Sequence, residues 1–424
     1  MPKLKVVVIL LLLLGLVFLV KDKVFQKRFE ITKSQIPSSE IYQGIGYVSV
    51  NNDLDISVLS DSVAAPTRLK ITPDNKYLLV TQISGEVLAF KRIDKSWESS
   101  PSLVTKVDTK FPGFPPDEAG LVGITFSKDY LTNGKVFLLH SFKDKEGKTQ
   151  NQISSSILKE TKNGLTGSNP KVIYQANVAG NPSHQITDAI NVDIEGKPHL
   201  LFLIGEGFDS KKSQDPSLEA GKLLLIQEDG SDPMGPRPYK ENSKVQALGI
   251  RNGYVLVKNQ SDPEGKIIIT DTGPDHFDRM IYTNPLAANP LNFFWDGVEA
   301  KLKNPIPDPN FPKVFDMVIQ RLPDTKTYVG ADFNKSGSLL ITLFGKTGFK
   351  DNMPGKEILK GNITNLTGQP KVSFQTIIKR NPEANGKLGN PIGLTIDKET
   401  DDFFFADVME GKIYQVKQRG GERK

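Results

Sequence analysis

The stretch LKITPDNKYLLVT at residues 69–81 decides the fold class of this chain. It contains an apolar run, a Pro-Asp-Asn turn and a second apolar run, and GEVLAF at residues 85–90 adds a third run. Short apolar runs separated by Gly, Pro, Asn and Asp are typical of antiparallel hairpins. The segment therefore predicts three consecutive antiparallel strands.

The same phrase returns with variation along the rest of the chain. The recurrences lie at residues 122–140, 186–204 with 221–226, 255–270, 329–344, and 392–406 with 411–416. About six such units favour a six-bladed β-propeller over the alternative of an irregular pair of β-sandwiches.

Two further segments complete the expected ring. We expect residues 53–59 to pair with the last unit as its outer strand, because this pairing closes the ring and removes an exposed edge. The long stretch of residues 284–326 is expected to form loops over one face.

Composition narrows the class of protein. The 424 residues include no cysteine and four histidines, which excludes disulfides and argues against a zinc site built from several histidines. His140 and His199 lie within apolar runs and are expected to pack rather than to bind a ligand. The net charge is +5 and Lys and Arg are scattered among Asp and Glu, so we expect no nucleic acid partner.

The N-terminus has the pattern of an export or anchoring segment. Residues 6–20 are apolar, with Lys3 and Lys5 before them and Lys21 after them. No small-x-small cleavage site follows, so residues 1–22 are expected to be an uncleaved signal anchor rather than a cleaved signal peptide. A linker at residues 23–43 and the propeller at residues 44–424 would follow.

This segment also predicts where the protein is found. The basic flank before the apolar run would stay inside the cell, so the body is expected on the extracytoplasmic side of the cell membrane. If the segment is cleaved, the protein would be secreted instead.

Three phrases carry candidate chemistry. ALGIRN at residues 247–252 ends in Arg251 and Asn252, DTGP at residues 271–274 forms a tight turn, and His184 lies upstream of both. Histidine accepts protons near neutrality, and arginine supplies a fixed positive charge. Alone, His184 would be read as part of a polar loop, but the order of these phrases favours a common site.

These phrases, together with GLVG at residues 120–123, GKLLLI at residues 221–226 and NFFWDG at residues 292–297, resemble the glucose/sorbosone dehydrogenase family. The family consists of quinoproteins built on a six-bladed β-propeller, and the resemblance covers most of the chain from about residue 53 to about residue 418. It implies an enzyme that oxidises an aldose or a related sugar with pyrroloquinoline quinone (PQQ) and calcium.

The resemblance implies roles in catalysis for four residues. His184 would be the general base that takes the hydroxyl proton, and Glu206 would be the carboxylate that orients it. Arg251 and Asn252 would contact the quinone oxygens, and Arg251 would also stabilise negative charge that builds up during hydride transfer.

Other residues are implied as contacts of the cofactor or the metal. Glu118 and Lys346 are further candidates for cofactor binding. The calcium ion would be held by the carbonyls of Gly273 and Pro274, with Asp278 beside them.

Two departures from the family pattern keep other functions open. Arg279 stands where the family has a glutamate, and GNPIGL at residues 389–394 lacks the arginines that soluble glucose dehydrogenases place on the cofactor. One alternative is a non-catalytic propeller that binds a glycan or a protein partner through residues 284–326. Another is a calcium-centred propeller hydrolase or lactonase. Its candidate carboxylates are Glu118, Glu206 and Asp278.

Overall fold

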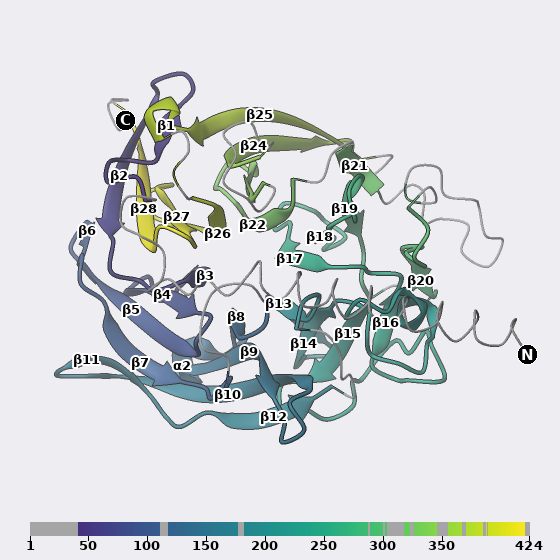
Figure 1. Cartoon of the computed structure of the whole chain (residues 1–424). Coiled ribbons are helices and arrows are strands. Elements are labelled where there is room, and N and C mark those ends of the chain that lie inside the picture. Colours follow the sequence, from purple (N-terminus) through teal and green to yellow (C-terminus); the bar gives the residue numbers. More distant parts are fainter. Residues whose placement is uncertain are drawn as a thin grey trace, which may run out of the picture.

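The computed structural model describes most of the chain after the N-terminal segment. The described residues are 41–110, 118–176, 182–286, 289–299, 302, 318–322, 326–345, 355–366, 370–384, 387 and 389–419. They form six sheets arranged radially around one centre, so the expected six-bladed all-β propeller is confirmed (Figure 1). The predicted anchor at residues 1–22 and Lys346 lie outside the described residues. Within the described ranges, no helix is long and apolar enough to cross a membrane.

The first three blades follow each other along the chain. The first contains β3 (Pro66–Ile71), β4 (Tyr77–Gln82), β5 (Glu86–Ile93), β6 (Ser96–Trp97) and β7 (Ser102–Lys106). The second contains β8 (Leu121–Phe126), helix α2 (Tyr130–Asn133), β9 (Lys135–Lys143), β10 (Thr149–Thr161), β11 (Gly164–Gly167) and β12 (Lys171–Gln175). The third contains β13 (Ile186–Ile194), β14 (Lys197–Ile204), the 3₁₀ helix η3 (Ser210–Gln214), β15 (Lys222–Gln227), β16 (Val245–Leu248) and β20 (Leu291–Asn292).

The last three blades include the strands that close the ring. The fourth contains β17 (Gly253–Lys258), β18 (Ile267–Asp271), β19 (Asp278–Thr283) and β21 (Val318–Leu322). The fifth contains β22 (Tyr328–Phe333), β23 (Leu339–Leu343), β24 (Glu357–Thr364), β25 (Lys371–Arg380) and β1 (Tyr47–Ser49), and the 3₁₀ helix η5 (Pro382–Ala384) follows β25. The sixth contains β26 (Pro391–Ile396), β27 (Phe403–Asp407), β28 (Lys412–Gln418) and β2 (Leu54–Ser60).

The N-terminal strands complete two neighbouring blades. β2 pairs antiparallel with β28, with Ile56 opposite Val416, which confirms the expected ring closure. β1 pairs antiparallel with β25, with Tyr47 opposite Arg380, a pairing that the sequence did not indicate. The chain before β3 therefore covers the outer edges of both the fifth and the sixth blade, which would otherwise be exposed.

The expectation that residues 284–326 would form loops is wrong at two places. β20 pairs in parallel with β16, and β21 pairs antiparallel with β19 as the outer strand of the fourth blade. Both pairings satisfy backbone groups of strands that would otherwise be sheet edges. Their partners lie far along the chain, and neither strand carries a clear alternating pattern.

The hydrophobic core lies between the blades. In the described part of the chain, one buried cluster separates each pair of neighbouring blades around the ring. The apolar run LLLI at residues 223–226 of β15 is fully buried. Two of its side chains pack toward one neighbouring blade and two toward the other. A strand buried on both faces needs a continuous apolar run rather than an alternating one.

The two histidines expected to pack are buried within blades. His140 lies 2.9 Å from the hydroxyl of Ser154, and burial lowers the pKa of His140 to about 4. His199 accepts the backbone N–H of Met234 at its Nε2. Both predictions of structural roles are confirmed.

One arginine spans the centre of the ring. Arg68, on β3, donates to the carbonyls of Thr187, Tyr254 and Val329, which belong to the inner strands of three other blades. Its guanidinium also lies 3.6 Å from the buried carboxylate of Asp188. These contacts tie four blades together at the axis.

Candidate active site

The predicted site residues gather where the inner strands of the second, third and fourth blades begin. Glu118 precedes β8, His184 precedes β13 and Asn252 precedes β17. Oε2 of Glu118 accepts the backbone N–H of His184 at 3.0 Å and Nδ2 of Asn252 at 3.1 Å. One carboxylate thus joins three blades at the same end of the ring.

His184 and Glu206 form a buried pair. Nδ1 of His184 lies 2.7 Å from Oε1 of Glu206, which follows β14, the neighbour of β13 in the third blade. Since a carboxylate accepts hydrogen bonds, the proton of the neutral imidazole is assigned to Nδ1 and the lone pair to Nε2. Nε2 has no hydrogen-bond partner among the described residues. The pair can therefore accept a proton at Nε2.

Phe208 covers one face of this histidine. The two rings are stacked with centroids 4.1 Å apart and an angle of 15° between planes, and Phe208 is 59% exposed. Its backbone φ of 63° lies in the left-handed region, which is unfavourable for a large side chain. Sequence reasoning missed Phe208, because no motif distinguishes it from an ordinary loop residue.

Gly205 allows the loop to pass close to its neighbours. A Cβ at this position would lie 2.6 Å from the carbonyl oxygen of His184 and 3.0 Å from that of Arg251. The backbone N–H of Glu206 also donates to the carbonyl of Arg251 at 2.9 Å. The glycine before Glu206 therefore brings the His184 loop and the Arg251 loop into contact.

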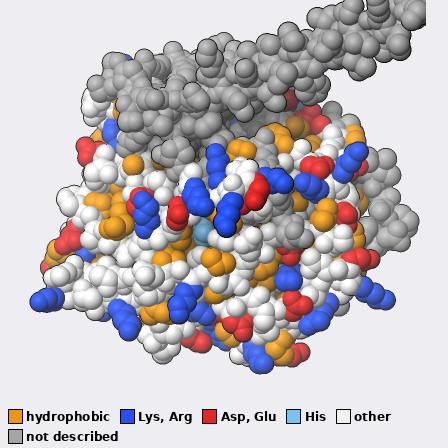
Figure 2. Space-filling model, turned by 60° about the horizontal axis from the view of Figure 1, so that its bottom comes forward, with side chains coloured by type: hydrophobic (Ala, Val, Ile, Leu, Met, Phe, Trp, Pro, Cys, Tyr) orange, Lys and Arg blue, Asp and Glu red, His pale blue; other side chains and the backbone are white. Residues whose placement is uncertain are grey.

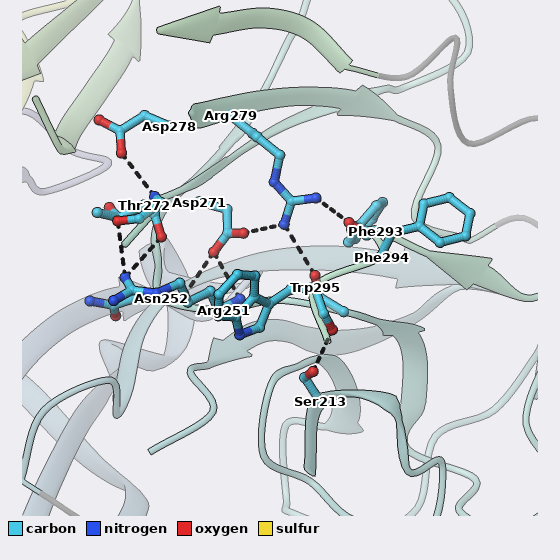
Figure 3. A network of polar contacts seen from close by, with 12 residues as sticks. Ser213, Arg251, Asn252, Asp271, Thr272, Asp278, Arg279, Phe293, Phe294 and Trp295 are labelled. Atoms are coloured by element: carbon cyan, nitrogen blue, oxygen red, sulfur yellow. Dashed lines mark hydrogen bonds and ion pairs between the residues drawn. The ribbon is translucent and has the colours of Figure 1, made fainter. Parts of the chain in front are cut away.

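Arg251 is directed at the turn that follows β18. Its Nη1 donates to the carbonyls of Thr272 at 3.0 Å and Gly273 at 3.2 Å (Figure 3). Its Cζ lies 5.7 Å from the ring centroid of Trp295. No residue in the described ranges bonds its Nε or Nη2, so these donors remain for a ligand.

Asp271 and Arg279 form a buried ion pair next to Arg251. Oδ1 of Asp271 accepts the backbone N–H groups of Arg251 at 3.0 Å and Asn252 at 2.8 Å, and Oδ2 bonds Nη2 of Arg279. Arg279 also donates to the carbonyls of Gly249 and Phe293 (Figure 3). Arg279 therefore cross-links two loops and neutralises the carboxylate that holds Arg251 and Asn252.

Asp278 is enclosed by backbone amides. One of its oxygens accepts the N–H of Gly273 at 2.9 Å, and the other accepts the N–H groups of Lys326 and Thr327, each at 2.6 Å. Burial raises the pKa of Asp278 to about 6, although these three amide bonds oppose the shift. One oxygen therefore fixes the turn at Gly273, and the other fixes the chain just before β22.

Two of the three predicted calcium ligands, Gly273 and Asp278, do not fit a calcium ion in this arrangement. Calcium takes six to eight oxygen ligands. Here the carbonyl of Gly273 accepts the Arg251 guanidinium, and the Asp278 oxygens accept backbone amides. In the described ranges, no group of three His, Asp or Glu side chains is placed to hold a metal ion.

Several buried polar atoms at this end of the ring have no partner in the described part of the chain. They are Oε2 of Glu206, Oδ1 of Asn252 and Nε1 of Trp295. Leaving such a group unpaired costs about 1–3 kcal/mol, so a ligand that pairs with these atoms would bind favourably. The ligand would need both donors and acceptors.

The loop after Glu206 positions Trp295. Ser213 and Gln214, at the end of η3, donate to the carbonyl of Trp295 at 2.5 Å and 2.7 Å. Nζ of Lys222 donates to the carbonyls of Lys212 and Ala220, each at 2.6 Å, and burial lowers the pKa of Lys222 to about 7. Lys222 therefore holds η3, and η3 holds the tryptophan.

Charged side chains of both signs lie on one face of the molecule. On the face that Figure 2 presents, Lys and Arg side chains are interspersed with Asp and Glu. This distribution agrees with the charge pattern of the sequence.

Comparison with known proteins connects this site to a family. The family model described as Glucose / Sorbosone dehydrogenase matches residues 63–290, more than half of the chain. The aldose sugar dehydrogenase YliI of Escherichia coli (strain K12) is 21% identical over 209 residues, which is 49% of this chain. The match spans 53% of that relative, about half of its length.

Solved structures share the fold over a longer range. The soluble aldose sugar dehydrogenase of Escherichia coli, in its apo form, has a TM-score of 0.65 and 17% identity, with 86% of this chain and 100% of that chain covered. The PQQ-bound aldose sugar dehydrogenase of Streptomyces coelicolor has a TM-score of 0.62 and 17% identity, with 86% and 98% covered. At these identities the likeness concerns the propeller fold, and membership follows from the family model: the chain belongs to the glucose/sorbosone dehydrogenase family.

Proposed function

We propose that this protein oxidises an aldose or a related sugar with PQQ as its cofactor, and that His184 is the general base. The observation that carries the proposal is the buried His184–Glu206 pair, 2.7 Å apart, whose Nε2 is left for a substrate proton. The family and the aldose sugar dehydrogenases among its relatives support the substrate class.

The residues around this pair fit PQQ. PQQ is a flat anion with several oxygen acceptors and one ring N–H. Nε and Nη2 of Arg251 and Nε1 of Trp295 offer donors to its oxygens, and Oδ1 of Asn252 offers an acceptor to its N–H. Glu118 would act indirectly, because its Oε2 already holds His184 and Asn252 in place.

The chain's own residues then account for the movement of the proton. Nε2 of His184 accepts the proton of the sugar's anomeric hydroxyl, while Glu206 stabilises the imidazolium that forms. When bound, PQQ supplies a two-electron acceptor for the hydride that leaves the anomeric carbon. Arg251 provides fixed positive charge where negative charge develops, and the sugar leaves as its lactone.

The test uses the full chain and PQQ. Equilibrium dialysis and the absorbance of the quinone measure binding, and the reduction of an electron-accepting dye with a panel of aldoses measures turnover. We expect stoichiometric binding and activity with at least one aldose. The absence of PQQ binding would exclude this function.

A second candidate is a non-catalytic propeller that binds a glycan. The misfit of the expected calcium ligands favours it, because a relative that has lost catalysis needs no metal. Binding of sugars to the full chain, with no dye reduction after loading with PQQ, would support this candidate over the first.

The cellular location is also a proposal. The apolar segment at residues 6–20 and its basic flank favour a membrane anchor with the propeller on the extracytoplasmic side. After cell fractionation, the intact protein should be found with the membranes. In a separate experiment, protease added to intact cells should degrade the propeller. Complete protection of the propeller in intact cells would exclude this orientation.

A further inference from the structure

The turn at residues 272–274 shows a guanidinium where the family places a divalent cation. We propose that Arg251, held by the buried Asp271–Arg279 pair, takes the place of calcium, so that this site binds its anionic quinone without a metal. The cofactor part of this inference rests on the proposed function, whereas the metal part concerns the chain alone.

The guanidinium of Arg251 already engages carbonyl oxygens of the turn. Nη1 of Arg251 lies 3.0 Å from the carbonyl oxygen of Thr272 and 3.2 Å from that of Gly273. Calcium held by the carbonyls of Gly273 and Pro274 would need the Gly273 oxygen at about 2.3–2.6 Å, and the guanidinium would then lie beside it. A calcium ion and the guanidinium of Arg251 cannot share the Gly273 carbonyl without strong repulsion.

The charged side chains at this site also oppose a divalent cation. Arg251 and Arg279 bring two positive charges to this site, and Asp271 brings one negative charge that pairs with Arg279. Asp278 is turned toward three backbone amides. Both carboxylates are therefore already paired, and the charge of Arg251 at the turn carbonyls has no carboxylate partner in the described ranges, which suits an anion and opposes a divalent cation.

Arg279 holds the loops around Arg251 together. A metal ion often fixes loops that would otherwise move, and Arg279 fulfils that task here. It connects Asp271 with the carbonyls of Gly249 and Phe293, and Asp271 in turn fixes the amides of Arg251 and Asn252 (Figure 3). Arg279 is thus a positioning residue that acts through Asp271.

Terbium luminescence tests the metal part directly. Tb³⁺ replaces calcium and emits when a nearby tryptophan is excited, and the chain has only two tryptophans, of which Trp295 lies next to Arg251. With the full chain free of cofactor, we expect no saturable sensitised emission up to about 1 mM Tb³⁺, the range of weak calcium sites. Emission that calcium displaces and that Trp295→Phe abolishes would overturn the proposal.

Binding of PQQ tests the cofactor part. Dissociation constants measured in EDTA and in excess calcium should agree within about twofold. Tightening by calcium of about tenfold or more would overturn the proposal. In EDTA, Arg251→Gln should weaken PQQ binding by about tenfold or more, because glutamine still offers an N–H donor but lacks the positive charge. Unchanged binding in this variant would also count against the proposal.

These outcomes separate the two proposals. If PQQ does not bind at all, the proposed function fails, while the terbium experiment still decides whether the turn accepts a metal. If PQQ binds only with calcium, the proposed function survives and the present inference fails.

Discussion

The two halves of the candidate site differ in how their charged groups are held. In the His184–Glu206 half, one short hydrogen bond joins the ends of two strands of the same blade. In the Arg251–Arg279 half, a buried ion pair, backbone amides and carbonyls lock several loops together.

This difference separates two tasks. The histidine has a ring nitrogen without a partner in the described ranges and can exchange a proton. Asp271, Arg279 and Nη1 of Arg251 fix the geometry of the loops, and the two guanidinium groups provide permanent charge. We therefore expect substitutions in the first half to affect turnover and substitutions in the second half to affect stability and cofactor binding.

The largest effect is expected from His184→Ala. Removing a general base lowers kcat by about 10²–10⁴-fold. Dye reduction with PQQ-loaded protein measures the loss, and circular dichroism and PQQ binding should remain close to those of the parent. His276→Ala is a matched control, because His276 is exposed and lies outside the His184–Glu206 pair. Persistent turnover in His184→Ala would refute the division of tasks.

The second prediction concerns Arg279→Met. It leaves the buried Asp271 carboxylate without its counter-ion, so the free energy of unfolding should fall by about 3–5 kcal/mol. Denaturant unfolding measures this change. Arg419→Met removes an exposed ion pair with Asp55 and should remain within about 1 kcal/mol of the parent. Equal stability of the two variants would contradict a structural role for Arg279.

The third prediction is a dependence of stability on pH. The pKa of Asp278 is raised from 3.8 to about 6, so the folded state binds this proton more tightly than the unfolded state. Its contribution to the free energy of unfolding should therefore fall by up to about 3 kcal/mol as the pH rises from about 4 to 6, and then remain constant.

Asp278→Asn isolates this contribution. The variant loses an acceptor for the surrounding amides and should be less stable overall, but the difference from the parent should shrink as the pH rises through this range. Unfolding curves at several pH values measure the difference. A difference that grows with pH would show that the carboxylate is ionised throughout.

The smallest effect is expected at Phe208. Loss of the stacked ring should lower kcat/KM by about 2- to 10-fold, equally in Phe208→Ala and Phe208→Gly. Glycine accepts the positive φ of this position, so Phe208→Gly should be more stable than Phe208→Ala by about 1 kcal/mol. Thermal unfolding of the pair would detect this difference, and equal stability would argue against strain at this residue.

Much of the fold could be predicted because its signals are local. The strand-turn-strand patterns at residues 69–81 and 392–406 form hairpins in the structure. Residues 53–59 pair with the last blade as expected. β1, β20 and β21 were missed, since each pairs with a strand outside its own local hairpin and carries no clear period of its own.

The candidate site was predicted in part for a similar reason. Motifs in order along the chain identified His184, Glu206, Arg251 and Asn252, and the structure brings them to one end of the ring. The stacking of Phe208 on the histidine was not predictable from any motif.

Arg279 illustrates the limit most clearly. In the sequence it is only a charge of unexpected sign beside a proposed metal site. Its role depends on Asp271, which lies one residue before the turn. Asp271 is directly opposite Arg279 on the neighbouring strand. The register of β18 against β19 decides that the two side chains form a pair.

The sequence by itself determined the number of blades, the closure of the ring and the family, because apolar periodicity and turn residues act over short stretches. Only the tertiary structure decided which charges are partners. A hydrogen bond requires its two atoms within about 3 Å, and strand register and blade packing set such distances between residues remote in sequence. Strand register and blade packing therefore determine that Arg251 faces the carbonyls of the turn and that Glu206 faces His184.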